Sequence, residues 1–168
     1  MSQPRFLLLH GIWDRGAPRP VWPNADDAVR RDGVNGECWY SWRLLGTNNR
    51  ELGRGSLVYV SPQACLEAIQ VARRDVADLR PSVVIGQDRQ WWWRADLGGS
   101  TFAVAARGYQ RQRECRYSLG MFAATLATAD GLDGLEAECP DGRCTTPGPG
   151  RRSARGLRMM PVGARGVA

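Results

Sequence analysis

A pattern that occurs twice, at an offset of 50 or 51 residues, constrains the fold of this 168-residue chain more than any other feature. It begins with a tryptophan and an arginine, continues to a tyrosine, and ends with a cysteine that opens a series of small and apolar residues. The matched pairs are Trp42 and Trp93, Arg43 and Arg94, Tyr59 and Tyr109, and Cys65 and Cys115. Such self-similarity predicts two copies of one supersecondary unit.

The residues that follow each cysteine have the spacing of an amphipathic helix. Apolar positions recur at steps of four and three, so they share one helical face. They are Cys65, Ile69, Ala72, Val76 and Leu79 in the first copy, and Cys115, Leu119, Phe122, Leu126 and Ala129 in the second. We therefore expect each copy to end in a helix that buries this face.

The first copy predicts a β-hairpin before its helix. Residues 38–45 are rich in aromatic residues, and the Gly-Thr-Asn-Asn sequence at 46–49 favours a turn, so a second strand is expected near 51–59. Ser61-Pro62 supplies an N-cap and a proline at the first helical position. The helix is expected to run to about Leu79.

The second copy predicts three strands and a helix. Strands are expected at 82–86, 91–95 and 101–106, with turns at 87–89 and 98–99 and a helix over about 110–129. Arg111, Arg113 and Arg116 lie in the first turns of this helix, where the helix dipole attracts anions. The alternative is that these arginines are simply solvated.

Alternation along the strands divides the aromatic residues between two faces of the sheet. The face expected to take the helices holds Tyr40, Trp42, Leu44, Trp91, Trp93 and Ala95. The residues that point away from it are Trp39, Arg43, Trp92 and Arg94. These four form the candidate binding face, because indole rings stack on planar groups and guanidinium groups pair with phosphate or carboxylate. The alternative is a face covered by a second subunit or by the N-terminal residues, through Trp13 or Trp22.

Composition divides the chain into three parts. Residues 1–37 are expected to form an irregular N-terminal lead, with one short strand near 28–31. Residues 38–130 form the tandem-repeat domain, and residues 131–168 a disordered tail rich in Arg, Gly and Pro. From Pro140 onward the 29 residues include six Arg, one Asp and no aromatic residue, so they carry +5 of the formal net charge of +6.

The five cysteines do not predict a disulfide framework, because their number is odd and no signal peptide precedes them. A reducing cytoplasm is the expected location. Cys65 and Cys115 are expected as buried, unreactive thiols. Cys139 and Cys144 have no second pair that would complete a zinc site, so neither a metal nor a cofactor is expected. The apolar run at 6–9 is too short to span a bilayer.

The start of the chain resembles the opening of α/β-hydrolases, because an apolar strand ends there in His10-Gly11. The hydrolase interpretation fails, because His10 is the only histidine and a triad needs its histidine late in the chain. The sequence also lacks the Gly-x-Ser-x-Gly motif that carries the nucleophile. The repeated positions offer no convergent polar groups besides the two core cysteines. No catalytic residue is therefore expected.

The order of the repeated segments resembles that of the YegP-like family of bacterial and archaeal proteins over roughly residues 38–130. The shared features are a Trp-Arg strand, an Asn-rich turn, a second strand ending near a tyrosine, and a helix with small apolar residues. Gly108-Tyr109 matches the Gly-Tyr pair of that family, whereas Val58-Tyr59 departs from it. The resemblance implies an α+β fold in which two tandem strand-strand-helix repeats form one antiparallel sheet, with strands exchanged between the units and both helices on one face. It implies no activity.

We therefore expect a small cytoplasmic binding or interaction module without catalytic activity. The alternative is a nucleic-acid-associated protein that uses the Trp/Arg sheet face and the basic tail. The partners expected on this basis are a second copy of the chain, bound through strand exchange or the sheet face, and weakly held nucleic acid. No contact with a membrane is expected.

Overall fold

The computed structural model describes residues 3–12, 38–129 and 131–133. In chain order its elements are β1 (Arg5–Ile12), β2 (Cys38–Leu45), β3 (Glu51–Gly55), α1 (Pro62–Arg74), the 3₁₀ turn η2 (Val76–Asp78), β4 (Arg80–Ile85), β5 (Trp91–Leu97), β6 (Ser100–Val104), α2 (Gln112–Thr128) and β7 (Gly131–Asp133).

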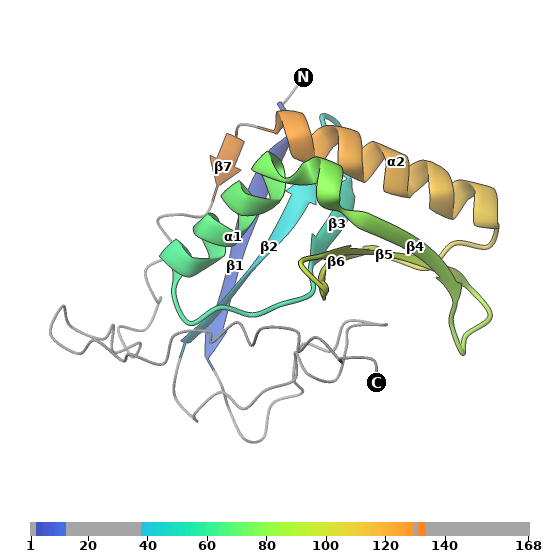
Figure 1. Ribbon diagram of the computed structural model, residues 1–168, viewed down its shortest axis with the longest axis horizontal. Coiled ribbons are helices and arrows are strands. Elements are labelled where there is room, and N and C mark those ends of the chain that lie inside the picture. The colour runs from blue at the N-terminus through green and yellow to red at the C-terminus, as the bar shows by residue number, and fades with distance from the viewer. Residues whose placement is uncertain (1–2, 13–37, 130, 134–168) are drawn as a thin grey trace, which may run out of the picture.

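The seven strands form one sheet in the order β4-β5-β6-β3-β2-β1-β7. All neighbouring strands are antiparallel except β1 and β7, which run parallel. Helices α1 and α2 lie side by side on one face of this sheet (Figure 1). The predicted α+β class, with an antiparallel sheet and two helices, is therefore confirmed.

The core lies between the sheet and the two helices. Trp42, Leu44, Trp93 and Ala95 are at most 1% exposed, which confirms the prediction that this face takes the helices. Phe122 of α2 joins the two halves of the core, since its ring centroid lies 6.4 Å from that of Trp42 and 4.7 Å from that of Trp93. Gly53 makes room for this contact, because a Cβ at position 53 would lie 2.6 Å from the Trp93 ring.

Both helices bury the face that their spacing predicts. Cys65, Ile69 and Ala72 are buried on α1, and the corresponding face of α2 contributes Cys115, Phe122 and Leu126. Ser61 caps α1 as predicted, with its Oγ accepting from the backbone N–H of Ala64 at 3.1 Å. The helix α1 ends at Arg74 rather than near Leu79, and η2 continues the chain as a tighter 3₁₀ turn.

The predicted turns also form. Asn49 has φ 59°, and Gly98 and Gly99 have φ values of 60° and 84°. This left-handed region favours Gly and Asn, so the composition of the two loops accounts for the chain reversals after β2 and β5.

The structure corrects both boundaries of the predicted domain. The predicted irregular lead, residues 1–37, contains β1. This strand pairs with β2 along its whole length, with Arg5 opposite Leu45 at one end and Ile12 opposite Cys38 at the other. Phe6 and Leu8 drive this pairing by entering the core, where they are 2% and 5% exposed. At the other boundary, β7 adds residues 131–133 of the predicted tail to the sheet. The expected strand at 28–31, Trp13, Trp22 and the remainder of the tail lie outside the described residues.

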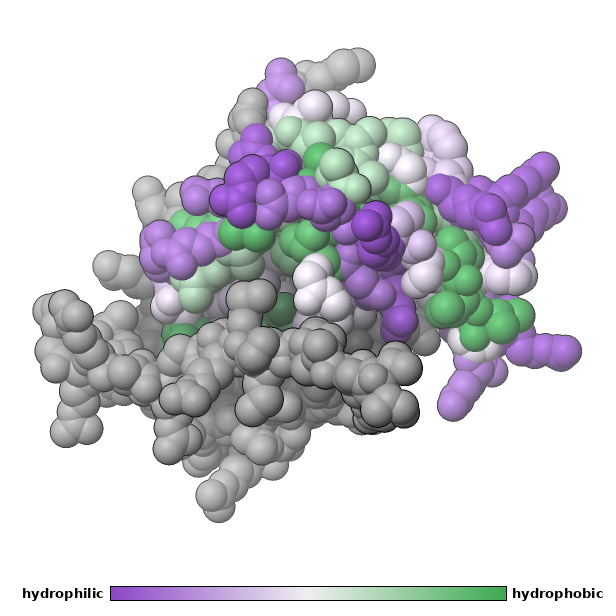
Figure 2. Space-filling view, viewed as in Figure 1, coloured by the Kyte–Doolittle hydropathy of each residue, from purple (hydrophilic) through white to green (hydrophobic). Residues whose placement is uncertain are grey.

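The strand β4 forms one edge of the sheet. Pro81 is compatible with this position, because a proline removes a backbone donor that an interior strand needs. Ile85 at the end of β4 is 60% exposed, and Figure 2 shows apolar side chains gathered over this strand.

Candidate functional site

The arginines of the predicted binding face lie in one row across the sheet. The register pairs Arg43 with Arg54, Arg54 with Val104, and Val104 with Arg94. Arg43 and Arg94 therefore share the face opposite the helices, but β3 and β6 separate them. Three strand spacings correspond to about 14 Å, so the two guanidinium groups do not form a single cluster.

The two tryptophans of the predicted face lie on opposite sides of this arginine row. β2 and β5 run in opposite directions, and Trp39 and Trp92 both precede their arginines in sequence. Trp39 packs over Gly11 of β1, whereas Trp92 packs over Gly86 and donates its indole N–H to Asp88 at 3.3 Å. The structure therefore does not bring the four residues together in one cluster, and a binding role for this face stays a prediction.

Carboxylates accompany the arginines of the row. Glu51 accepts two hydrogen bonds from Arg54, at 2.5 and 2.8 Å, and lies 3.8 Å from the Arg43 guanidinium. Asp96 lies 3.7 Å from Arg94. These pairs reduce the positive potential that a phosphate would meet on this face.

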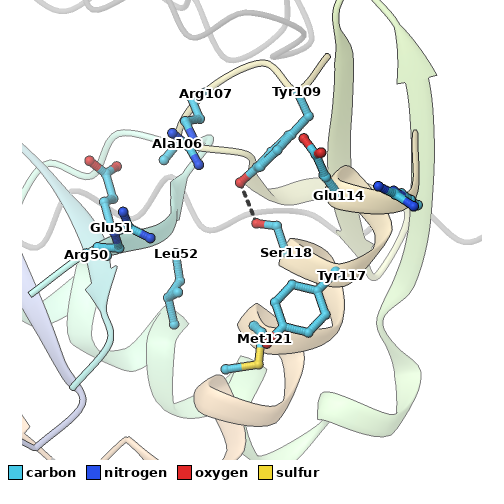
Figure 3. Close-up of a pocket in the computed structure, with 11 residues that line it drawn as sticks. Arg50, Glu51, Leu52, Ala106, Arg107, Tyr109, Glu114, Tyr117, Ser118 and Met121 are labelled. Carbon is cyan, nitrogen blue, oxygen red and sulfur yellow. Dashed lines mark hydrogen bonds between the residues drawn. The ribbon is translucent and has the colours of Figure 1, made fainter. Parts of the chain in front are cut away.

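A pocket on the helix side of the molecule brings more functional groups together. It has a volume of about 820 Å³ and lies between the start of β3, the loop that joins β6 to α2, and one side of α2 (Figure 3). We call it the α2 pocket. Its lining consists of Arg50, Glu51, Leu52, Ala106, Arg107, Tyr109, Arg113, Glu114, Tyr117, Ser118 and Met121.

Three polar side chains form a hydrogen-bonded chain at the wall of the α2 pocket. Ser118 Oγ accepts a hydrogen bond from the hydroxyl of Tyr109 at 2.5 Å and another from Trp93 Nε1 at 3.2 Å. Trp93 belongs to the core and Ser118 to α2, so this chain fixes the helix and the loop relative to the sheet. Because Ser118 Oγ accepts twice, its own proton remains available to an acceptor in the pocket.

The charges of the α2 pocket are unevenly paired. Each of its two carboxylates pairs with an arginine at the margin of the pocket. Glu51 pairs with Arg54, and Glu114 lies 3.7 Å from Arg111. The Arg107 guanidinium lies 5.3 Å from the centroid of the Tyr109 ring. Within the described residues, the guanidinium groups of Arg50, Arg107 and Arg113 form no ion pair with a carboxylate.

Apolar side chains form the rest of the α2 pocket. Tyr117 is 71% exposed and Met121 is 40% exposed, although both are large apolar side chains. They lie on α2, with Leu52 of β3 across the pocket from them (Figure 3). The pocket therefore combines uncompensated cations with an exposed apolar surface.

The cysteine predictions are confirmed in part. Cys65 and Cys115 are free and fully buried, and burial raises the pKa of Cys65 to about 12 and that of Cys115 to about 11. Such thiols stay protonated and unreactive near neutral pH. Cys38 is disulfide-bonded, which was not predicted. A disulfide is atypical of a reducing cytoplasm, and that location stays a prediction.

The sequence pointed to only one member of the α2 pocket. Arg113 belongs to the arginine cluster noted at the start of the second helix, whereas Arg111 pairs with Glu114 and Arg116 does not line the pocket. The remaining lining residues come from three separate segments, and only those of α2 follow a helical period. Within the described residues, no three His, Cys, Asp or Glu side chains lie close enough together to hold a metal ion. No described helix has the length and apolar character needed to cross a bilayer.

No protein-family model matches the chain, and no curated protein matches it. A solved structure that is similar is the solution NMR structure of YegP from E. coli, a protein of unknown function. The two chains are 9% identical with a TM-score of 0.44, and the match covers 55% of this chain and 79% of that chain. The resemblance to the YegP-like family is therefore confirmed as a distant structural resemblance.

Proposed function

We propose that this chain is a non-catalytic binding module and that its ligand occupies the α2 pocket. The observation that carries the proposal is a combination of side chains in one concavity of about 820 Å³. Tyr117 and Met121 are exposed there, beside three arginines that form no ion pair with a carboxylate of the described residues. Pockets of this size that mix apolar walls with a few polar groups are typical of small-molecule sites.

The non-catalytic part of the proposal rests on the state of the candidate nucleophiles. Cys65 and Cys115 are buried in the core and protonated. Ser118 reaches the pocket, but its partners are Tyr109 and Trp93, and neither is a general base at neutral pH. An activated serine needs a base that accepts its proton.

We also propose that β2-β3-α1 and β5-β6-α2 are tandem copies of one unit. Two observations support this origin. Register shifts occur between Leu44 and Leu45 in one unit and between Ala95 and Asp96 in the other. Isolated bridges join Tyr40 to Tyr59 and Trp91 to Tyr109, at the offsets that the sequence repeat gives. This correspondence matches Trp92 with Ser41 rather than with Trp39.

The geometry supports association with nucleic acid less well. That alternative needs an arginine surface with a positive potential, and the arginines of the row face Glu51 and Asp96. A homodimer remains a further proposal, which the open edge of β4 and the exposure of Ile85 support.

A small-molecule fragment library tests the proposed function, with amide chemical shifts as the readout. We expect fragments to perturb Leu52, Ser118 and their neighbours, and the perturbation to disappear in Met121→Ser. Val71→Ser is the matched control, because Val71 lies at the corresponding position of α1 and is also exposed, at 41%. Perturbations confined to the Trp39 or Trp92 surroundings, or lost equally in both variants, would contradict the proposal.

A further inference from the structure

We propose, on the basis of the proposed function, that the ligand of the α2 pocket is a planar apolar ring that carries an oxyanion, either a carboxylate or a phosphate. The ring would lie against Tyr117 and Met121, and the oxyanion would pair with the arginines. The inference rests on four features: the charges of the pocket, its free hydroxyl proton, its apolar wall, and the difference between the two units of the chain.

The charges select an anionic ligand. Arg50, Arg107 and Arg113 line the pocket from three segments, and none has a carboxylate partner within the described residues. The two acids of the pocket do not cancel this charge, because Arg54 binds Glu51 through two hydrogen bonds and Arg111 faces Glu114. Guanidinium groups bind carboxylate and phosphate through paired N–H donors, so either anion suits the site.

The hydroxyl of Ser118 adds a neutral donor beside these cations. Its oxygen already accepts from Tyr109 and from Trp93, so only an acceptor can satisfy its proton. An oxyanion supplies such an acceptor. A cationic ligand would be repelled by the arginines and would offer no acceptor for the Ser118 proton.

The apolar part of the pocket selects a planar ring. Tyr117 presents an aromatic side chain that is 71% exposed, and the flexible thioether of Met121 lies one helical turn further along α2. Aromatic and methionine side chains make favourable contacts with rings, and Arg107 already occupies the face of Tyr109. Leu52 closes the opposite side (Figure 3).

The first unit provides an internal comparison. At an offset of 50 residues, Arg50, Arg107 and Arg113 correspond to Ser100, Leu57 and Gln63, and Tyr117 and Met121 correspond to Glu67 and Val71. The core positions Trp42 and Trp93 are the same in both units. Arg107, Arg113 and Tyr117 thus have no counterpart of the same chemistry in the first unit, and Arg50, which comes from the first unit, has none in the second. The set that lines the α2 pocket is not repeated, as expected for a ligand site rather than a requirement of the fold.

Isothermal titration calorimetry with three matched probes tests the inference. 1-Naphthylacetate carries a carboxylate, 1-naphthyl phosphate carries a phosphate, and 1-naphthylacetamide is neutral. We expect at least one of the anions to bind about tenfold more tightly than the amide, the effect of one hydrogen bond to a charged group. The anion that binds more tightly shows whether the oxyanion of the ligand is a carboxylate or a phosphate.

Variants assign the effect to the pocket. Arg107→Gln and Arg113→Gln should each weaken the preferred anion about tenfold and leave the amide unchanged, whereas Tyr117→Ser should weaken all probes. Arg116→Gln is the control, because Arg116 is exposed on α2 but does not line the pocket. Unchanged thermal unfolding midpoints would show that the variants are folded.

The possible outcomes separate the inference from the proposed function. Equal affinity for the amide and both anions, with loss of all binding in Tyr117→Ser, would overturn the oxyanion and leave the pocket as the site. Equal weakening by Arg116→Gln and Arg113→Gln would also overturn it, since the effect would then be general electrostatic attraction. Binding that tolerates Tyr117→Ser, or binding only of an acidic peptide or an oligonucleotide, would overturn both.

Discussion

Ser118 accepts hydrogen bonds from two side chains whose counterparts in the first unit are buried without a partner. Trp42 Nε1 and the hydroxyl of Tyr59 are buried without a hydrogen bond, whereas their counterparts, Trp93 Nε1 and the Tyr109 hydroxyl, both donate to Ser118. Burial raises the pKa of Tyr59 well above its ordinary value; the Trp42 indole opposes this shift but does not reach hydrogen-bonding geometry. Ala68 occupies the position that corresponds to Ser118.

We predict that Ala68→Ser raises the free energy of unfolding by about 1 kcal/mol, because its hydroxyl can accept from both orphaned donors. The reverse change, Ser118→Ala, should lower it by about 1–3 kcal/mol, since Trp93 Nε1 and the Tyr109 hydroxyl would then lose their acceptor. Urea unfolding of the two variants measures both effects. A destabilised Ala68→Ser would show that the first unit has no room for the hydroxyl.

The buried thiols predict a loss of stability in alkali. Burial raises the pKa of Cys65 to about 12 and that of Cys115 to about 11, from an ordinary value of 9.0. Above the ordinary value the unfolded chain releases thiol protons that the folded chain keeps, so the free energy of unfolding falls as pH rises from about 9 toward 11 and 12. Urea unfolding between pH 7 and 10.5 should show this fall, and Cys65→Ala should make it shallower. A slope unchanged by Cys65→Ala would contradict the assignment.

At the scale of elements, the tryptophans of β2 and β5 hold the sheet to the helices. Trp42 and Trp93 are 0% and 1% exposed, and both rings face Phe122 of α2. We predict that Trp42→Ala and Trp93→Ala each cost roughly 3–5 kcal/mol, the range for truncation of a buried aromatic side chain. Trp92→Ala is the control on the other face of the sheet and should cost less. If urea unfolding shows that Trp92→Ala lowers the free energy of unfolding as much as the other two variants do, this account of the core is contradicted.

The elements could be predicted from the sequence where a local period is strong. Helix spacing identified the buried faces of α1 and α2, and alternation assigned Trp42 and Trp93 to the core. β1 was not included in the predicted domain, because it has no partner in the repeat pattern and 25 residues, 13–37, separate it from β2. Its pairing is a long-range contact, which local patterns do not report.

The candidate site could not be predicted in the same way. Trp39 and Trp92 are grouped by alternation, which places both on the face away from the helices, but the offset of 51 matches Trp92 with Ser41 rather than with Trp39. The antiparallel directions of β2 and β5 then place the two rings apart. The α2 pocket depends on how residues 50–52 approach α2, and that approach follows from the pairing of β3 with β6.

At the scale of the whole molecule, the two units share one core. β3 pairs with β6, and a Cβ at Gly53 of β3 would meet both Trp93 and Phe122 of the second unit. We therefore predict that residues 80–139 do not fold as a monomer when expressed alone, since about 60 residues without β3 leave these side chains uncovered. A dispersed amide spectrum from a monomer would contradict this. A homodimer that replaces the missing unit would be consistent with it.

The α2 pocket lies where these two units meet, because β3 comes from the first and α2 from the second. A crystal structure of the full chain with saturating 1-naphthylacetate or 1-naphthyl phosphate tests the account most directly. We predict density for the ring against Tyr117 and for the oxyanion within hydrogen-bonding distance of Arg107 or Arg113. Density for the ligand elsewhere on the molecule, or an empty α2 pocket at saturation, would contradict it.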